Sequence, residues 1–539
     1  MKHFSLLLLI AFVGCTPRKE PVDLLLYNAR VYTADADFST VSAFAVSNGR
    51  IVEVGDSEQL QAKFEAGQLL DAGGRTVIPG LIDAHCHFYD LGLKQQQLDL
   101  TGSLSFQEVL NRVGEFRHRK QMDFIFGKGW DQNDWELKEF PDKSELDSLY
   151  PDIPVVLERI DGHAYLVNQK VLDLAGIGTN TLAEGGEIIK INGEPSGILI
   201  DGPMDLVNAI IPKPTIDTRI QAFREAEKIC LGYGLTTVND AGLDPEIISL
   251  IDSLQQAGRI NIRVYAMVSS RLENLEHFLE NGPLKTDRLN VRSFKVYADG
   301  ALGSRGAALK APYSDQPGHF GAMVTPVDRI YNLAERIAES GFQMNTHAIG
   351  DSANAVVLRA YRKVLGTRPD QRWKIEHAQV VSPADAALFD NGIIPSVQPT
   401  HATSDMYWAG ERLGQAREGH AYAYKTLLKS AGRIALGTDF PVEEVNPFLT
   451  FYAAVARQDI KGYPDGGYRP EEALSREEAL KGMTIWAAWS NFEENEKGSI
   501  EEGKWADFVI LSNDLMQVPV HDIPGLVAEQ VYIGGEKVK

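Results

Sequence analysis

The sequence has few cysteines and, after Cys15, no apolar run long enough to cross a bilayer. Three cysteines in 539 residues, Cys15, Cys86 and Cys230, are too few for a disulfide framework. Basic residues are also in deficit. The 53 lysines and arginines against 74 acidic residues give a net charge of −21, which argues against nucleic acid or an anionic membrane surface as a partner. The length allows one large domain or several average ones.

The first fifteen residues are typical of an export signal. Met1-Lys2-His3 is a short basic start, and the apolar run 6–13 is too short to span a bilayer. The following Gly14-Cys15 resembles the end of a bacterial lipoprotein signal, in which the lipidated Cys15 becomes the first mature residue. A conventional secretory signal cleaved nearby is the alternative. In either case we expect an exported protein, and a lipid would anchor it on the periplasmic or cell-surface side of a membrane.

Both ends of the mature chain have the pattern of short β-strands. The N-terminal strands are expected at 23–28, 29–33, 43–47 and 50–54, with Asn48-Gly49 as a hairpin turn between the last two. Segments 506–511 and 527–533 have the same character, and Gly534-Gly535 follows them. The sequence therefore predicts a small β-sandwich built from residues 16–76 and 485–539.

Between these ends, apolar strands alternate with helical patterns at 220–231, 329–340 and 353–365, which is typical of a parallel sheet. We predict a (β/α)8 barrel over residues 77–484. An open doubly wound sheet is the alternative, but no glycine-rich phosphate loop follows the first strand. The eight expected strands are 77–88, 235–240, 260–267, 292–298, 342–347, 373–377, 393–398 and 433–437.

Roughly 145 residues separate the first expected strand from the second, far more than one helix and its loops need. Residues 106–116 have a helical pattern, and 124–129 and 154–158 have strand patterns. An inserted subdomain at about 89–218 is therefore expected. Because it leaves from the carboxyl end of a strand, we expect it to overhang the mouth where barrel active sites lie.

His85 and His87 end the first expected strand. Side chains alternate along a strand, so both imidazoles would project to one side and reach one metal ion. Cys86 would point the opposite way and pack against its neighbours. A His-x-His pair alone is a weak motif, and the later strands decide its interpretation.

Four later strands carry further candidate ligands at or near their carboxyl ends: Lys295, His347, His377 and Asp439. Each alone has a structural explanation, such as a core histidine, a helix-capping aspartate or a lysine at the rim. Lys295 is harder to dismiss, because its apolar neighbours would direct it into the barrel, where an unpaired ammonium is costly. The occurrence of all four, in order and on separate strands, indicates one shared metal site.

This series of residues on a barrel flanked by a split β-sandwich resembles the amidohydrolase superfamily. Four motifs are similar to those of its branch called amidohydrolase family 3, which includes N-substituted formamide deformylase-like enzymes. They are Gly-Trp-Asp at 129–131, Arg-Ile-Asp-Gly-His at 159–163, Asp-Gly-Ala-Leu-Gly-Ser-Arg at 299–305 and Gly-Thr-Asp-Phe-Pro at 437–441. The resemblance covers nearly the whole mature chain, with no departure at the ligand positions.

The resemblance implies one or two divalent ions, expected to be Zn²⁺, with manganese or iron as alternatives. The ligands would be His85, His87 and Asp439 for the more buried ion, and His347 and His377 for the second. Lys295, carboxylated by carbon dioxide, would bridge the two ions, and burial favours the neutral amine that this reaction needs. Asp439 would also be catalytic, taking a proton from a metal-activated hydroxide and passing it to the leaving nitrogen.

Four residues outside the ligand set are candidates for substrate binding: Trp130, Asp131, His163 and Arg305. His163 is also a catalytic candidate, because the resemblance suggests that it contacts the substrate or stabilises an oxyanion. The alternative is a structural histidine beside Asp161. His401, just past the seventh strand, could be a pocket residue or a helix cap.

The predicted function is hydrolysis of a non-peptide carbon–nitrogen bond in a small amide of the N-formyl or N-acyl type. A cyclic amide or imide hydrolase, a deaminase or a lactonase on the same scaffold is the alternative, because fold does not fix function. A surface lipoprotein that binds a ligand without catalysis belongs to another class, and the intact ligand set argues against it. The sequence leaves a homodimer open.

Overall fold

The computed structural model describes residues 19–160, 162–182, 186–366, 370–390 and 392–539. The expected signal at 1–15, including Cys15, lies outside these residues. The chain forms two compact units. We call the described residues of 19–86, 230–244 and 261–539 the barrel unit, and those of 87–229 and 245–260 the insert unit. Among the described helices, none combines the length and apolar character needed to cross a bilayer.

Eight parallel strands form the centre of the barrel unit, in the order β22-β21-β20-β19-β18-β16-β15-β8, and a short β17 (Leu284–Lys285) pairs with β18. This sheet confirms the predicted barrel. The strands are β8 Leu81–Cys86, β15 Leu235–Leu243, β16 Arg263–Ser269, β18 Leu289–Tyr297, β19 Gln343–Ala348, β20 Trp373–His377, β21 Ile393–Val397 and β22 Ala435–Leu436.

The segment after β22 packs directly on β8 and brings the two ends of the strand series together. The buried carboxylate of Asp83 accepts hydrogen bonds from the Thr438 hydroxyl at 2.7 Å and the Thr438 amide at 3.1 Å. The Asp439 amide donates to the His85 carbonyl at 2.8 Å. A Cβ at Gly437 would lie 2.5 Å from the His85 amide nitrogen, so only glycine allows this close approach.

The first barrel strand is shorter than predicted. Residues 77–88 do not form one strand, because β7 (Thr76–Pro79) belongs to the terminal β-layers and β8 starts after Gly80. The Gly80 amide donates to the backbone carbonyl of Asp507 in those layers. The Leu81 amide donates to the backbone carbonyl of Gly234 in the barrel unit. A Cβ at Gly80 would lie 2.2 Å from the Thr236 hydroxyl. The chain therefore changes sheets at Gly80, where only glycine fits.

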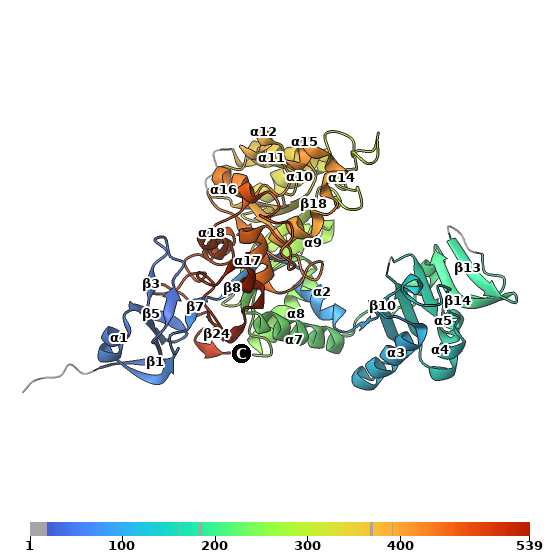
Figure 1. Cartoon of the computed structure of the whole chain (residues 1–539), viewed down its shortest axis with the longest axis horizontal. Coiled ribbons are helices and arrows are strands. Elements are labelled where there is room, and N and C mark those ends of the chain that lie inside the picture. The colour runs from blue at the N-terminus through green and yellow to red at the C-terminus, as the bar shows by residue number, and fades with distance from the viewer. Residues whose placement is uncertain (1–18, 161, 183–185, 367–369, 391) are drawn as a thin grey trace, which may run out of the picture. The chain divides into compact units, whose positions relative to one another are not determined.

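Strands from both ends of the chain build two small sheets, shown in blue and red in Figure 1. One has the order β5-β4-β1-β6 and the other β25-β24-β23-β7-β2-β3. They share an apolar core that includes Phe508 and Tyr532, whose rings stack at 4.3 Å. The strands are β1 Glu20–Tyr27, β2 Arg30–Tyr32, β3 Thr40–Val41, β4 Ala43–Ser47, β5 Arg50–Gly55, β6 Phe64–Asp71, β23 Phe508–Leu511, β24 Ala528–Ile533 and β25 Glu536–Lys537.

The longer helices of the barrel unit have apolar residues at helical spacing. In α10 the buried residues are Ile330, Leu333, Ala334 and Ile337, which form one stripe along the helix. The helices are α1 Ser57–Lys63, α9 Leu272–Asn281, α10 Val327–Ala338, α11 Asp351–Leu365, α12 Pro383–Ala386, α13 Pro399–Asp405, α14 Ala409–Leu413, α15 Gln415–Glu418, α16 Tyr424–Ala431, α17 Pro447–Ala456, α18 Arg476–Gly482 and α19 Ile485–Ser490.

The insert unit is built on a mixed sheet with the strand order β13-β14-β12-β11-β10-β9. Its strands are β9 Leu98–Asp99, β10 Ile125–Trp130, β11 Val155–Arg159, β12 Ala164–Val167, β13 Gly186–Ile191 and β14 Glu194–Asp201. Its helices are α2 Phe88–Lys94, α3 Phe106–Lys120, α4 Ser144–Leu149, α5 Gln169–Ala175, α6 Met204–Asn208, α7 Ile216–Gly232, which runs to the unit boundary, and α8 Pro245–Gln256. The unit extends beyond the expected insert, since it includes residues 219–229 and 245–260.

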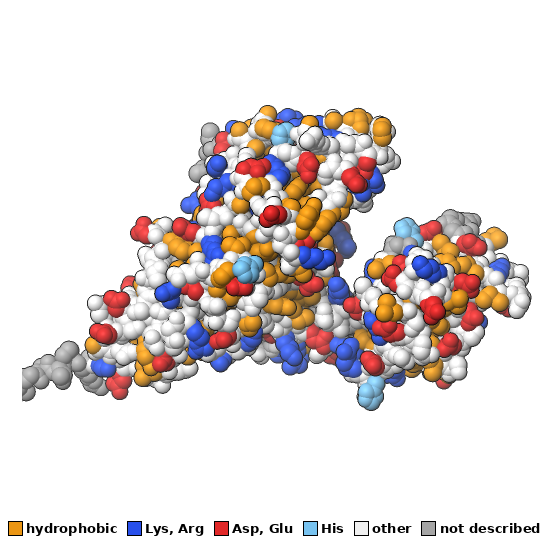
Figure 2. Space-filling model, viewed as in Figure 1, with side chains coloured by type: hydrophobic (Ala, Val, Ile, Leu, Met, Phe, Trp, Pro, Cys, Tyr) orange, Lys and Arg blue, Asp and Glu red, His pale blue; other side chains and the backbone are white. Residues whose placement is uncertain are grey.

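Surface charge is mixed on the face shown in Figure 2, where acidic and basic side chains alternate over both units. On that face the acidic side chains are not gathered in one patch.

Candidate metal centre

Three buried residues from separate parts of the barrel converge on one point. His85 lies in β8, His377 ends β20, and Asp439 follows β22. Their ligand atoms all lie within 4.8 Å of one another. His377 and Asp439 have positive φ angles of 73° and 66°, which non-glycine residues adopt at a cost. Such strain at two strand ends indicates that the surrounding structure holds these side chains in place for a function.

Lys295 lies beside this cluster, in the interior of the barrel. Its Nζ is 3.1 Å from Nε2 of His85, and the side chain is 1% exposed. Burial lowers the pKa of Lys295 to about 8, although the nearby carboxylates of Glu376 and Asp439 act in the opposite direction. The structure therefore favours the neutral amine that carboxylation needs.

His347 of β19 lies next to His377, with 4.5 Å between the ring centroids. Its Nε2 is buried and has no hydrogen-bond partner among the described residues; Oδ1 of Asp299 is 3.7 Å away. Burial, and secondly the charge of Lys295, lower the pKa of His347 to about 3. The imidazole is thus neutral, the form that binds a metal ion.

His87 does not lie on β8 as the His-x-His motif predicted. The strand ends at Cys86, and His87 is the residue before α2, at the start of the insert unit. Its Nδ1 lies 4.0 Å from Oδ2 of Asp90. Its role as a metal ligand stays a prediction. Cys86 is fully buried and its thiol lies 3.4 Å from the Asn239 carbonyl, the packing position that strand alternation indicates.

Sequence reasoning missed two residues that contact the candidate ligands. Oε2 of Glu376 lies 2.6 Å from Nδ1 of His85, and Oε1 of Gln398 lies 2.8 Å from Nδ1 of His377. A signal for Glu376 was present, because Lys374 and Glu376 are charged residues at alternate positions of a strand expected to be buried. No comparable pattern marks Gln398.

His401 lies within α13 and close to Asp439, so it is not the cap of that helix. Its Nε2 is 3.5 Å from Oδ2 of Asp439, and its Nδ1 is 2.9 Å from Nε2 of Gln379. The N-cap of α13 is Gln398. The His401 ring therefore faces one oxygen of the candidate proton-transfer residue.

The predicted substrate residues of the insert unit differ in exposure. Trp130 is 1% exposed in the apolar core, where its indole donates to the Leu157 carbonyl at 2.8 Å. Asp131 accepts from Arg159 at 2.6 Å and from the Asn133 amide at 2.9 Å. These contacts explain both residues structurally within the unit, and their contact with substrate stays a prediction.

His163 has a side chain that is 73% exposed, and its Nδ1 lies 2.8 Å from Oδ1 of Asp201. Asp161, the partner considered from sequence, lies outside the described residues. Arg305 belongs to the barrel unit, where its guanidinium pairs with Asp315 at 2.7 Å. His163 is the candidate whose ring is most open to a ligand, and for both residues substrate binding stays a prediction.

Asp299, which opens the 299–305 motif, fixes two loops beside the centre. Its buried carboxylate accepts from the amides of Ala308, Ile349 and Gly350 at 2.8 to 3.0 Å. Burial raises the pKa of Asp299 to about 7, and these hydrogen bonds oppose that rise. The motif therefore ties the loop after β18 to the loop after β19. His347 lies in β19, directly before that second loop.

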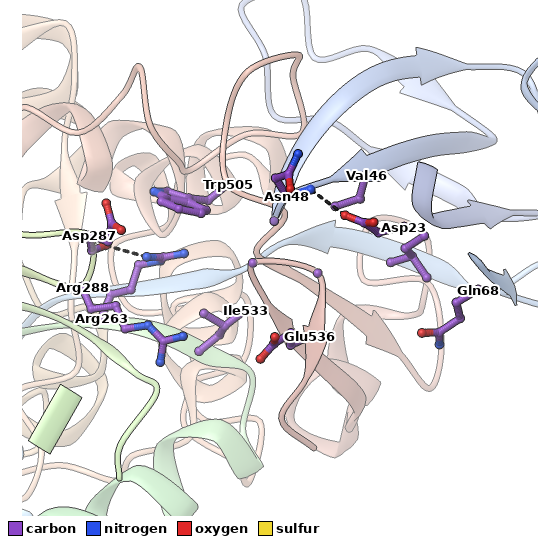
Figure 3. A pocket seen from close by; sticks show the side chains of 14 residues that line it. Asp23, Val46, Asn48, Gln68, Arg263, Asp287, Arg288, Trp505, Ile533 and Glu536 are labelled. Atoms are coloured by element: carbon purple, nitrogen blue, oxygen red, sulfur yellow. Dashed lines mark hydrogen bonds between the residues drawn. The ribbon is translucent and has the colours of Figure 1, made fainter. Parts of the chain in front are cut away.

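A pocket of about 440 Å³ in the barrel unit contains none of the predicted site residues (Figure 3). It is lined by residues of the terminal sheets and by Arg263, Arg288 and Trp505. The guanidinium of Arg263 is already paired with Asp507 at 2.6 Å. This hollow is therefore separate from the chemistry of the centre.

The residues of the centre fit a divalent metal. Buried neutral imidazoles and a carboxylate are the nitrogen and oxygen ligands that Zn²⁺ takes in catalytic sites. The solvent-shielded Nε2 of His347 is explained by such an ion, because a buried nitrogen without a hydrogen bond is otherwise costly.

Comparison with known proteins agrees with this geometry. Residues 68–539 match the model of the amidohydrolase family. The chain is 33% identical to the protein LONG AFTER FAR-RED 3 of Arabidopsis thaliana, covering 96% of this chain and 91% of that protein. It is 32% identical to the putative amidohydrolase YtcJ of Bacillus subtilis, covering 94% of this chain and 98% of that protein. It is 27% identical to the N-substituted formamide deformylase of Arthrobacter pascens, covering 95% and 97%.

A solved structure, an uncharacterized metal-dependent hydrolase from Pyrococcus furiosus, is also similar. It superposes with a TM-score of 0.78 and 29% identity, over 92% of this chain and all of that one. The barrel, its buried histidine–aspartate cluster and a family match over most of the sequence lead to one conclusion. The chain belongs to the amidohydrolase family and is a hydrolase of carbon–nitrogen bonds.

Proposed function

We propose that this protein hydrolyses the amide bond of a small N-formyl or N-acyl amide. The observation that carries the proposal is the convergence of His85, His377 and Asp439, with the Lys295 amine 3.1 Å from His85. A relative with 27% identity over most of both chains is an N-substituted formamide deformylase, which supports this class of substrate.

His85, His87 and Asp439 would hold one divalent ion, expected to be Zn²⁺, and His347 and His377 would hold a second. The ligand atom of His377 lies within 4.8 Å of those of His85 and Asp439, so the two proposed sites adjoin. When bound, such ions lower the pKa of water and polarise a carbonyl group. We propose that Lys295 is carboxylated, because a carbamate turns a buried cation into an anionic oxygen ligand between two dications.

Asp439 is the proposed proton carrier. Its carboxylate lies 3.6 Å from Nε2 of His85 and 3.5 Å from Nε2 of His401, so each oxygen faces an imidazole nitrogen. From this position it would accept a proton from the attacking water and deliver it to the leaving nitrogen. His163 would donate a hydrogen bond to the substrate carbonyl. Trp130, Asp131 and Arg305 would contact other parts of the substrate.

The test is a hydrolysis screen of N-formyl, N-acyl and cyclic amides, with metal content measured on the same preparation. We expect formate or carboxylate release from the open-chain amides, and loss of that release in Asp439→Asn. Turnover of cyclic amides, imides, lactones or aminated ring compounds alone would replace this substrate class with one of the alternatives. A folded, metal-loaded protein that hydrolyses none of them would contradict the proposal.

We further propose that Cys15 carries a lipid and anchors the exported enzyme to a membrane. The support is the sequence of residues 1–15 alone. In a bacterial host, the unaltered chain should sediment with membranes, and Cys15→Ser should be released to the soluble exported fraction. Equal membrane content in both would contradict the anchor. The homodimer stays a prediction.

A further inference from the structure

A buried carboxylate lies against His85 on the ring nitrogen opposite Lys295. Oε2 of Glu376 is 2.6 Å from Nδ1 of His85, while Lys295 is 3.1 Å from Nε2. The side chains of His85 and Glu376 are both 0% exposed. The imidazole is therefore held between two groups, and each group faces one of its nitrogens.

The chemistry of the two neighbours decides which nitrogen carries the proton. An ionised carboxylate can only accept a hydrogen bond, so Nδ1 must be the protonated nitrogen. A neutral imidazole has one N–H, which leaves the lone pair on Nε2. Nε2 is also the nitrogen 3.6 Å from Oδ1 of Asp439, so the lone pair points into the candidate metal centre.

Lys374 lies on the same side of β20 as this carboxylate. It precedes Glu376 by two positions, so both side chains lie on the same face of the strand. Lys374 is fully buried, and its Nζ donates to Oδ1 of Asn491 at 2.7 Å. Burial raises the pKa of Glu376, but contact with His85, then the charge of Lys295 and lastly that of Lys374, outweigh burial and lower it.

We propose that Glu376 is a positioning residue for the metal centre, which fixes the tautomer and the ring orientation of His85 and thereby raises metal affinity. The inference concerns metal binding by the apo protein, so it holds or fails independently of the substrate. A purely structural role, in which Glu376 only neutralises Lys374, predicts no effect on metal affinity in a folded variant.

The decisive experiment is a Zn²⁺ titration of the full-length apo protein against a competing chelator, at fixed dissolved carbon dioxide. Glu376→Gln keeps the size of the side chain but removes its charge and its exclusive acceptor character. We expect the Zn²⁺ dissociation constant to rise 10- to 100-fold, the usual effect of removing a group that orients a metal-binding histidine.

Glu493 offers a matched control in the same unit. It is also fully buried and ionised, and it pairs with Lys285 and Lys497 instead of a candidate ligand. Glu493→Gln should lower stability in a similar way but leave Zn²⁺ affinity unchanged. Equal affinity of Glu376→Gln and the unaltered protein, with both folded by circular dichroism, would overturn the proposal.

A second measurement decides the question even if Glu376→Gln does not fold. In apo protein labelled with ¹⁵N-histidine, His85 should give the chemical shifts of a neutral ring protonated at Nδ1. The signal is assigned by its loss in His85→Asn. A ring protonated at Nε2 would overturn the proposal.

Discussion

Nζ of Lys295 and Nε2 of His85 lie 3.1 Å apart in the interior of the barrel, closer than two cations could be held there. Burial lowers the pKa of both groups, and the charge of Lys295 lowers the pKa of His85 further. His85 is therefore held neutral, and at a given pH a larger fraction of Lys295 is the neutral amine than for an exposed lysine. The first two predictions follow from this pair.

Lys295→Ala should reduce kcat/KM for the amide substrate at least 100-fold, because the proposed carbamate could no longer form and supply an oxygen ligand. A short carboxylic acid, such as acetate or propionate, should restore part of the activity by occupying the space of the carbamate. Lys363, which is exposed and paired with Glu335, offers a control whose replacement by alanine changes nothing. Full activity of Lys295→Ala without added acid would show that the lysine is no ligand.

The pKa of Lys295 predicts how reactivation depends on pH. The folded pKa is lowered from 10.5 to about 8, so the neutral amine predominates above pH 8 and is progressively protonated below it. At constant dissolved carbon dioxide, the rate at which metal reactivates the apo enzyme should rise up to about pH 8 and then level off. A rate that keeps rising towards pH 10 would indicate an ordinary lysine.

His401→Asn should separate catalysis from metal binding. The imidazole contacts Asp439 at 3.5 Å but lies outside the proposed ligand set, so metal content should stay unchanged. We expect kcat to fall at least about tenfold, because the proton carrier loses the group that orients it. Loss of metal together with activity would instead make His401 a ligand.

Gly80 should matter for stability and not for chemistry. A Cβ at this position would meet the Thr236 side chain at 2.2 Å, so Gly80→Ala should destabilise the fold by about 1–3 kcal/mol through overpacking. Gly525→Ala is the control, because no atom lies within 4 Å of its Cβ position. The comparison of thermal midpoints by circular dichroism tests this, and equal midpoints would contradict the tight contact.

The barrel was predictable because buried parallel strands have apolar runs, and the predicted limits of 373–377 match β20. The break between β7 and β8 at Gly80 was not predictable, because Val77, Ile78, Leu81 and Ile82 are equally apolar. The close contact of Gly80 with Thr236 is visible only in three dimensions.

The candidate ligands could be proposed from sequence because each lies at or near the carboxyl end of a recognisable strand. Their hydrogen-bond partners could not be assigned to them, because contacts such as Glu376 with His85 join positions 291 residues apart. The boundary of the insert unit was missed for a similar reason. Helix α8 has an ordinary amphipathic pattern, which does not say against which unit it packs.

The central claim is that a metal ion held by the barrel residues carries out amide hydrolysis. The most direct test is to remove metal with a chelator and to titrate Zn²⁺ back while following both bound metal and hydrolysis of an N-formyl amide. We predict no turnover in the apo protein and activity that rises in proportion to bound metal, up to one or two equivalents. Full activity in a protein without metal would contradict the account.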